Sequence, residues 1–259
     1  MRIGAYQFAV SGSMENNYLI IRKAIRFAVE KGIRLIVFPE CALTGYPPHD
    51  IEKPSAVEFE ELDSIYEQLQ SMVDRYGIHV IVGSIIEDKG AYYNCALCFA
   101  PGKDKQIYYK NALWGWDADN FSERKSTGIF EVDDWKIGVR ICYEVRFPEY
   151  FRSLYREKTD LNVILFYDVS NMDNEERYSL IDAHIRTRAV ENVTHTLTVN
   201  AISPYQTAPT LLCDRTGRRL CESERNKESL LSYDLIKENL DFGEQGRKAI
   251  SDRLVNGNE

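Results

Sequence analysis

The stretch WKIGVRICYEVRFPE, residues 135–149, decides how the rest of the chain is interpreted. Between Ile137 and Ile141 apolar and other residues alternate, which is the period of a β-strand. Pro148 suits the first turn of a helix. Cys142 therefore lies where a strand ends and the chain turns, a place where a side chain is held rigidly and can still be reached by a ligand. On this stretch alone, a buried core cysteine is the simpler interpretation.

The composition is that of an acidic globular protein. The chain has 259 residues, 44% of them hydrophobic and 28% charged, which is ample for a core. A net charge of −8 argues against a nucleic-acid or anionic-membrane partner, because either needs a basic face. No apolar run approaches a membrane span, and residues 1–4 lack a signal-peptide layout. We therefore expect a cytoplasmic protein whose six cysteines are reduced.

Neither the cysteines nor the histidines predict a metal site. Cys95 and Cys98 form a single CxxC pair with no second pair and no nearby histidine, so two strand residues are the better interpretation. The four histidines are scattered along the chain. We expect no metal and no cofactor.

Helical and strand patterns alternate along the chain, which predicts an α/β fold. Two segments, near residues 80–110 and 129–141, read as hairpins, so we expect mixed rather than purely parallel sheets. No linker-like tract and no internal repeat interrupts the pattern. The sequence predicts a single domain over residues 1–259, with a polar arm or tail and a short helix from about residue 234.

Three reactive side chains each follow a predicted strand. Glu40 comes after a strand ending at Phe38, Lys110 directly after Tyr109, and Cys142 after Ile141. In a layered α/β domain such strand ends can meet at one cleft. A carboxylate can serve as general base toward a thiol, and a lysine can lower the thiol pKa and stabilise an oxyanion. The alternative is a surface glutamate, a surface lysine and a core cysteine.

The sequence around these three residues resembles the signature blocks of the nitrilase superfamily, the carbon–nitrogen hydrolases. The three blocks are VFPECALTGY (37–46), YYKNALW (108–114) and ICYEVRFPE (141–149), and the helix RTRAVEN (186–192) is a further likeness. The resemblance runs from about Arg2 to Tyr233. It implies a four-layer αββα sandwich with two mixed β-sheets that dimerises, and a catalytic triad of Glu40, Lys110 and Cys142.

The resemblance also implies a reaction on a small linear amide, either an ω-amide or an N-carbamoyl compound. Cys142 attacks the amide carbonyl while Glu40 takes the thiol proton, and Lys110 with the backbone N–H of Tyr143 holds the oxyanion. Ammonia or an amine leaves, and water hydrolyses the thioester.

One position departs from the family pattern. Members usually carry a second glutamate after the lysine, but the segment here reads WGWDADNF (114–121). The register predicts Asp119 in that role, with Asp117 as the alternative. Two solvated loop charges are the competing interpretation.

Residues that flank the triad are the expected substrate contacts. They are Tyr46, Trp114, Trp116, Tyr143, Arg146 and Asn171. Arg146 either binds a substrate carboxylate or pairs with Glu144 or Glu149 and fixes the loop.

Two other functions compete with the amidase. A catalytically weakened family member acting as a binding or assembly protein would explain an aspartate in place of the second glutamate. A nitrile hydrolase ranks lower, because true nitrilases usually have a different block around the cysteine.

Overall fold

Two six-stranded sheets face each other at the centre of the computed structural model, which describes residues 1–255. In chain order the elements, with 3₁₀ turns labelled η, are β1 (Arg2–Gln7), α1 (Met14–Glu30), β2 (Leu35–Val37), η1 (Pro54–Ala56), α2 (Phe59–Tyr76), β3 (His79–Asp88), β4 (Ala91–Phe99), β5 (Gln106–Tyr109), α3 (Trp116–Asn120), β6 (Ile129–Val132), β7 (Trp135–Ile141), η2 (Cys142–Arg146), α4 (Pro148–Arg156), β8 (Leu161–Phe166), β9 (Val169–Ser170), α5 (Glu175–Asn192), β10 (His195–Asn200), β11 (Tyr205–Gln206), β12 (Leu211–Cys213), β13 (Arg219–Glu222), β14 (Ser229–Asp234) and α6 (Phe242–Val255).

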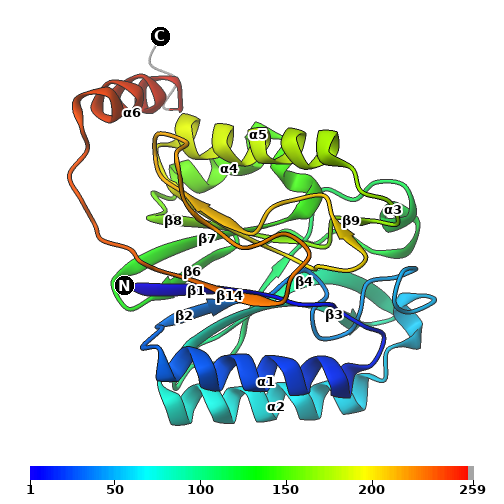
Figure 1. Ribbon diagram of the computed structural model, residues 1–259. Helices are drawn as coiled ribbons and strands as arrows, with labels where there is room; N and C mark the ends of the chain where they lie inside the picture. The colour runs from blue at the N-terminus through cyan, green and yellow to red at the C-terminus, as the bar shows by residue number, and fades with distance from the viewer. Residues whose placement is uncertain (256–259) are drawn as a thin grey trace.

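Helices cover the outer face of each sheet, which makes four layers (Figure 1). The first sheet has the order β14-β1-β2-β3-β4-β5 and is covered by α1 and α2. The second has the order β13-β12-β10-β8-β7-β6 and is covered by α4 and α5. Both contain parallel and antiparallel pairs. The predicted αββα sandwich with two mixed sheets is confirmed.

Three apolar cores hold the layers together. One lies between the sheets, where Val37 of β2 and Ile141 of β7 are completely buried. The other two lie under the helix pairs. Because β2 is covered on both sides, its residues are apolar on both faces, and this explains its continuous hydrophobic run.

The carboxyl ends of β2, β5 and β7 carry the three reactive side chains. In the first sheet β2 pairs in parallel with β3, and two successive antiparallel pairings bring β5 back to the same direction. In the second sheet β7 runs parallel to β8. Helix α3 and strand β9 lie at one side of the sandwich, whereas α6 lies at the other (Figure 1).

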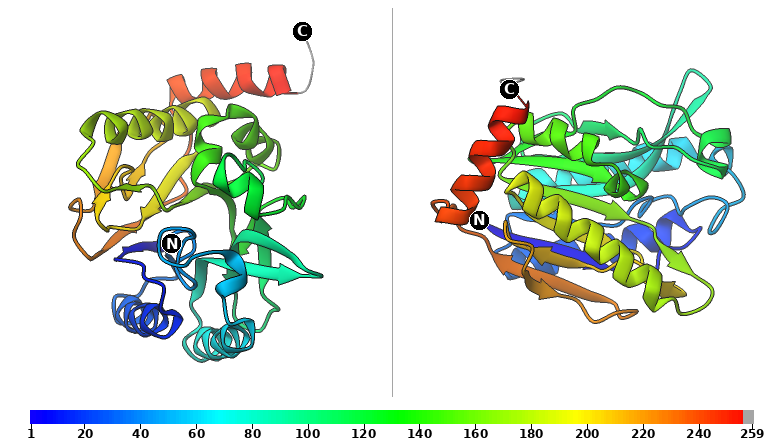
Figure 2. Two further views of the ribbon diagram at one scale, coloured as in Figure 1. Left: turned by 90° about the vertical axis from the view of Figure 1, so that its right-hand side faces the viewer. Right: turned by 90° about the horizontal axis from the view of Figure 1, so that it is seen from above.

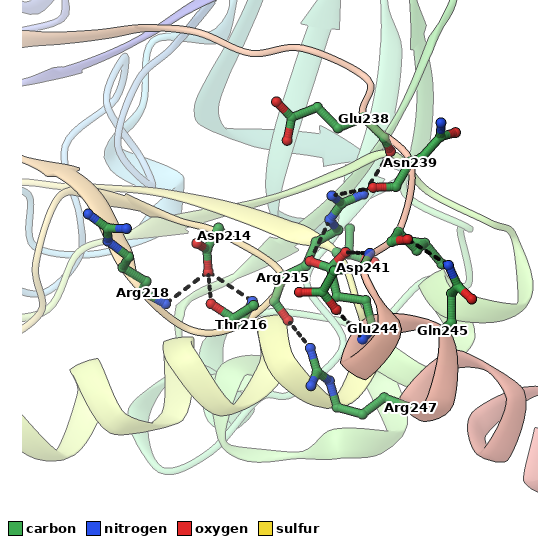
Figure 3. Close-up of polar contacts among 12 residues, drawn as sticks. Asp214, Arg215, Thr216, Arg218, Glu238, Asn239, Asp241, Glu244, Gln245 and Arg247 are labelled. Atoms are coloured by element: carbon green, nitrogen blue, oxygen red, sulfur yellow. Dashed lines mark hydrogen bonds and ion pairs between the residues drawn. The ribbon is translucent and has the colours of Figure 1, made fainter.

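The C-terminal segment crosses the outside of the sandwich and ends in α6 (Figures 1 and 2). Helix α6 docks through polar contacts. Arg215, in the turn between β12 and β13, donates to Glu244 at 3.0 Å and to the carbonyl of Glu238 at 3.1 Å (Figure 3). Within residues 1–255, every helix is too short or too polar to cross a membrane.

Candidate active site

Glu40 is buried between the sheets just after β2. Its Oε1 accepts hydrogen bonds from the Asn94 side chain and from Lys110 Nζ, both at 2.7 Å, and its Oε2 accepts from the backbone N–H of Tyr167 at 2.9 Å. Gly83 of β3 makes this approach possible. A Cβ there would meet the Pro39 carbonyl oxygen at 2.3 Å and the Glu40 Cα at 2.5 Å, too close for any side chain.

Lys110 follows β5 and is as buried as Glu40. Its backbone N–H donates to the Asn94 carbonyl at 2.9 Å, and its Nζ also donates to Asp117 Oδ2 at 2.8 Å. Burial alone would lower the pKa of Lys110, but the charges of Glu40 and Asp117 outweigh it and raise this pKa well above its ordinary value. The ammonium group therefore stays charged between two carboxylates.

The structure places Asp117, and not Asp119, beside the lysine. Asp117 is buried in the first turn of α3, where it binds Lys110 and accepts from the Tyr46 hydroxyl at 2.6 Å. Asp119 is exposed to solvent. The preference for Asp119 is thus wrong and the alternative fits, because the short helix turns two neighbouring acidic positions in different directions.

Cys142 lies on the second sheet, at the junction of β7 and η2. Its backbone has a φ of 47°, an uncommon conformation for a residue with a side chain. Burial and the charge of Glu40 raise the pKa of the thiol well above its ordinary value, and Lys110 offsets this only in part. The backbone N–H of Tyr167 donates to Glu40 and also limits the rise of the thiol pKa. The structure therefore brings together Glu40, Lys110 and Cys142 as the strand ends predicted.

Glu144 is a site residue that the sequence analysis missed. It is completely buried, and its Oε1 accepts from the Tyr108 hydroxyl at 2.7 Å and from the N–H of Asn111 at 2.8 Å. Its Oε2 accepts from the N–H of Ile141 at 2.7 Å. One carboxylate thus joins the residue after Lys110 to the residue before Cys142. Its position two residues after the cysteine was the available signal.

Within residues 1–255, Arg146 forms no ion pair with Glu144 or Glu149, and the Glu144 oxygens accept from Tyr108, Asn111 and Ile141 instead. Its guanidinium lies 5.4 Å from the ring centre of Tyr143. The pKa of His184 on α5 is lowered, first by burial, then by the charge of Arg188, and finally by the charge of Arg146. The interpretation that an ion pair with either glutamate fixes the loop is therefore wrong.

The aromatic residues expected at the cleft differ in their placement. Tyr46 is held against Asp117 and stacks on Tyr167 with ring centres 4.8 Å apart. Trp116 packs edge-on against a neighbouring core ring. Tyr143 packs edge-on in the turn after the cysteine. Trp114 is 75% exposed. Asn171 is also exposed, in the segment after β9.

The cluster has the groups for acyl transfer through a cysteine. A neutral thiol adjoins a buried carboxylate that can take its proton, and a charged lysine adjoins both. The carboxylate, lysine and thiol come from two sheets, so their arrangement depends on the packing of the whole sandwich.

Comparison with a family model gives one match, "Carbon-nitrogen hydrolase", over residues 2–241. The ω-amidase NIT2 of Xenopus tropicalis is 28% identical over 215 residues, which cover 77% of this chain and 74% of that protein. The deaminated glutathione amidase of Synechocystis is 26% identical over 220 residues, covering 78% and 76%.

Solved structures share the whole architecture. An amidase of Nesterenkonia sp. AN1 superimposes with a TM-score of 0.81 at 22% identity, covering 98% of this chain and 99% of that one. A mutant of that amidase carries the acetamide moiety of fluoroacetamide on its active-site cysteine, and it matches with a TM-score of 0.79 at 22% identity over 91% and 90% of the two chains. At this identity the likeness establishes the fold.

Proposed function

Because this chain belongs to the carbon–nitrogen hydrolase family, we propose that it hydrolyses the C–N bond of small linear amides through a cysteine thioester. The observation that carries this proposal is the contact of buried Glu40 with Lys110 at 2.7 Å, next to a thiol on which both charges act. The activities of the ω-amidase and the deaminated glutathione amidase support an amide as the substrate class.

The first half-reaction transfers the acyl group to the enzyme. The Cys142 thiol is neutral at rest because its pKa is raised, so attack on the carbonyl carbon requires a base to take its proton. Glu40 is that base. As the C–S bond forms, Lys110 and the backbone N–H of Tyr143 stabilise the negative charge on the carbonyl oxygen. The C–N bond then breaks, and ammonia or an amine leaves with the proton from Glu40.

The second half-reaction returns the enzyme to its starting state. Water attacks the thioester carbon while Glu40 takes one of its protons. The C–S bond breaks, the carboxylic acid departs, and the sulfur recovers the proton. Asp117 binds Lys110 Nζ together with Glu40 throughout, and we assign it the role of the family's second carboxylate.

A panel of ω-amides, N-carbamoyl amino acids and nitriles tests this function by the ammonia released. We expect release from amides by the wild type and none from Cys142→Ala, which removes the nucleophile and leaves the sheets intact. Cys41→Ala is a matched control, since Cys41 is also buried beside Glu40. Equal release by the wild type and Cys142→Ala contradicts the mechanism. Release from nitriles alone favours the nitrile hydrolase, and no turnover with tight amide binding favours a binding protein.

We further propose that the protein works as a homodimer in the cytoplasm. Phe147 and Leu180 are exposed on the layer of α4 and α5, where a second copy can cover them. All six cysteines are unbridged, as a reducing compartment requires. Light scattering coupled to size-exclusion chromatography tests the dimer, and a monomeric mass at micromolar concentration contradicts it.

A further inference from the structure

A cavity of about 730 Å³ lies at the end of the second sheet opposite the proposed catalytic cluster. It is lined by residues at the amino ends of three neighbouring parallel strands, namely Trp135 of β7, Asp160 just before β8 and His195 of β10. Cys142 follows the carboxyl end of β7, so the length of that strand, about 20 Å, separates the cavity from the thiol. A cavity of this volume is large enough for a small-molecule ligand.

The C-terminal arm and α6 form the outer wall of this cavity. Ile236 of the arm and Asp252 of α6 both line it. The arm is held by Lys237, whose Nζ lies 3.1 Å from Asp160. Helix α6 is held by the hydroxyl of Tyr155 on α4, which donates to Asp252 at 2.6 Å. The wall therefore consists of segments that are distant in the chain, and polar contacts join them.

Two of the basic side chains that line the cavity are not engaged by a carboxylate. Ion pairs take up three others, which are Lys237, Lys248 and Arg215. Arg156, at the end of α4, and Lys158, two residues later, are exposed and form no ion pair within residues 1–255. In a protein of net charge −8, two such cations at the edge of a cavity favour an anionic ligand.

Asn192, the last residue of α5, adds a buried acceptor to the same cavity. It lines the cavity and is only 1% exposed. Its Nδ2 donates to the carbonyl of Arg188 at 2.8 Å, but its Oδ1 accepts no hydrogen bond within residues 1–255. A buried acceptor without a donor is unfavourable, so a ligand that donates to this oxygen is stabilised. The proposed reaction gives Asn192 no role, although it ends the RTRAVEN stretch.

We propose that this cavity is a second ligand site, which binds a small organic carboxylate with an apolar body and a hydrogen-bond donor. The carboxylate lies at Arg156 and Lys158, and the donor meets Asn192 Oδ1. The apolar body packs against Ile236, which is 65% exposed in the empty cavity and is covered on binding. The site is separate from the catalytic cluster, and the inference does not rest on the proposed function.

Displacement of a fluorescent probe from the full chain tests the ligand class. The probe is 8-anilinonaphthalene-1-sulfonate, an aromatic anion, and we expect it to bind saturably. We expect 3-(4-hydroxyphenyl)propionate to displace it. The neutral alcohol with the same skeleton, 4-(3-hydroxypropyl)phenol, should displace it about tenfold more weakly, because it lacks the charge. The acid without the phenol hydroxyl, 3-phenylpropionate, should be weakened severalfold, because it lacks the donor.

A double variant at the cations locates the binding site. Arg156→Gln/Lys158→Asn should weaken the affinity for the hydroxyphenyl acid about 10- to 100-fold, the range for losing hydrogen bonds to charged groups. Asparagine suits the backbone at Lys158, whose φ is 58°. Lys23→Gln/Arg26→Gln is the matched control, because it removes the same charges from exposed positions on α1 outside the cavity. The control should bind like the wild type.

A second pair of variants tests the apolar wall. Ile236→Glu places a carboxylate on the arm and should weaken the acid at least as much as the loss of the cations. Ile250→Glu is its control, because Ile250 lies on α6, is 48% exposed and does not line the cavity. Both substitutions are at exposed positions, so the fold should be kept.

Three results overturn the inference: equal affinities of the acid and the alcohol, equal losses in a cavity variant and its control, or an affinity for the acid that survives both cavity variants. Failure of the wild type to bind the probe also overturns it. Because binding is measured without turnover, any of these results leaves the proposed amide hydrolysis intact. Conversely, ammonia release that is equal in the wild type and Cys142→Ala removes the proposed function and leaves this site untouched.

Discussion

Two ion pairs of this protein, Lys110 with Glu40 and Arg215 with Glu244, are built by different means. The Lys110 pair unites segments that are 70 residues apart and meets a cysteine from the opposite sheet. The Arg215 pair lies on the other side of the sandwich and binds the start of α6 to one turn (Figure 3). There Glu244 also accepts from the N–H of Asp241 at 2.9 Å, while Asp241 accepts from the N–H of Glu244 at 2.7 Å.

This reciprocal contact is a capping box, which a helix forms from its own first turn. The difference shows that two ion pairs of similar chemistry can have different roles in one protein. The Arg215 pair attaches one element to the body. The Lys110 pair is held in place by the whole sandwich, so changes around it are expected to affect activity most.

Asp117→Asn should have the largest effect. It removes one of the two charges that flank Lys110, and we expect kcat to fall about 100-fold, as for the loss of one electrostatic group in an active site. Steady-state kinetics on the best amide measures it. Asp119→Asn, two residues away and exposed, is the control and should stay near the wild type. An equal loss in both variants would return the role to Asp119.

Glu144→Gln should have the second-largest effect on activity. The glutamine amide turns an N–H₂ group toward N–H donors, which leaves part of the network unsatisfied and costs about 1–3 kcal/mol of unfolding free energy. Because the turn around Cys142 shifts, kcat should fall about tenfold with little change in KM. Urea unfolding and kinetics together measure both effects, with exposed Glu149→Gln as control. A loss of stability with normal kcat would show that Glu144 does not position the cysteine.

Glu244→Gln should have the smallest effect on activity, within about twofold, because the residue lies away from the cluster. Loss of the charge weakens the contact with Arg215 by about 1 kcal/mol. Hydrogen exchange within α6 should speed up, while the sheets keep their protection. Glu238→Gln is a matched control, since only the backbone carbonyl of Glu238 binds Arg215. Faster exchange throughout the sheets would show that α6 supports the whole sandwich.

Much of the fold was predictable because its signals are local. The strand before Cys142, the turn at Pro148 and the apolar run before Glu40 depend on neighbouring residues, and the structure confirms them. The capping of α6 is equally local, but its docking on the turn at Arg215 is not. Nothing in residues 242–255 indicates that this helix docks through Glu244 and leaves Phe242 exposed.

The site was predictable only in part. The sequence by itself determined that Glu40, Lys110 and Cys142 each follow a strand, since alternating patterns locate strand ends. Only the tertiary structure decided which aspartate reaches Lys110 and that Glu144 faces inward. Those outcomes depend on side-chain direction and on close approach, such as Glu40 against Gly83, where a fraction of an ångström matters. A sequence pattern indicates whether a segment is a helix or a strand, because each has its own period. The distances between elements are fixed only when the two sheets pack.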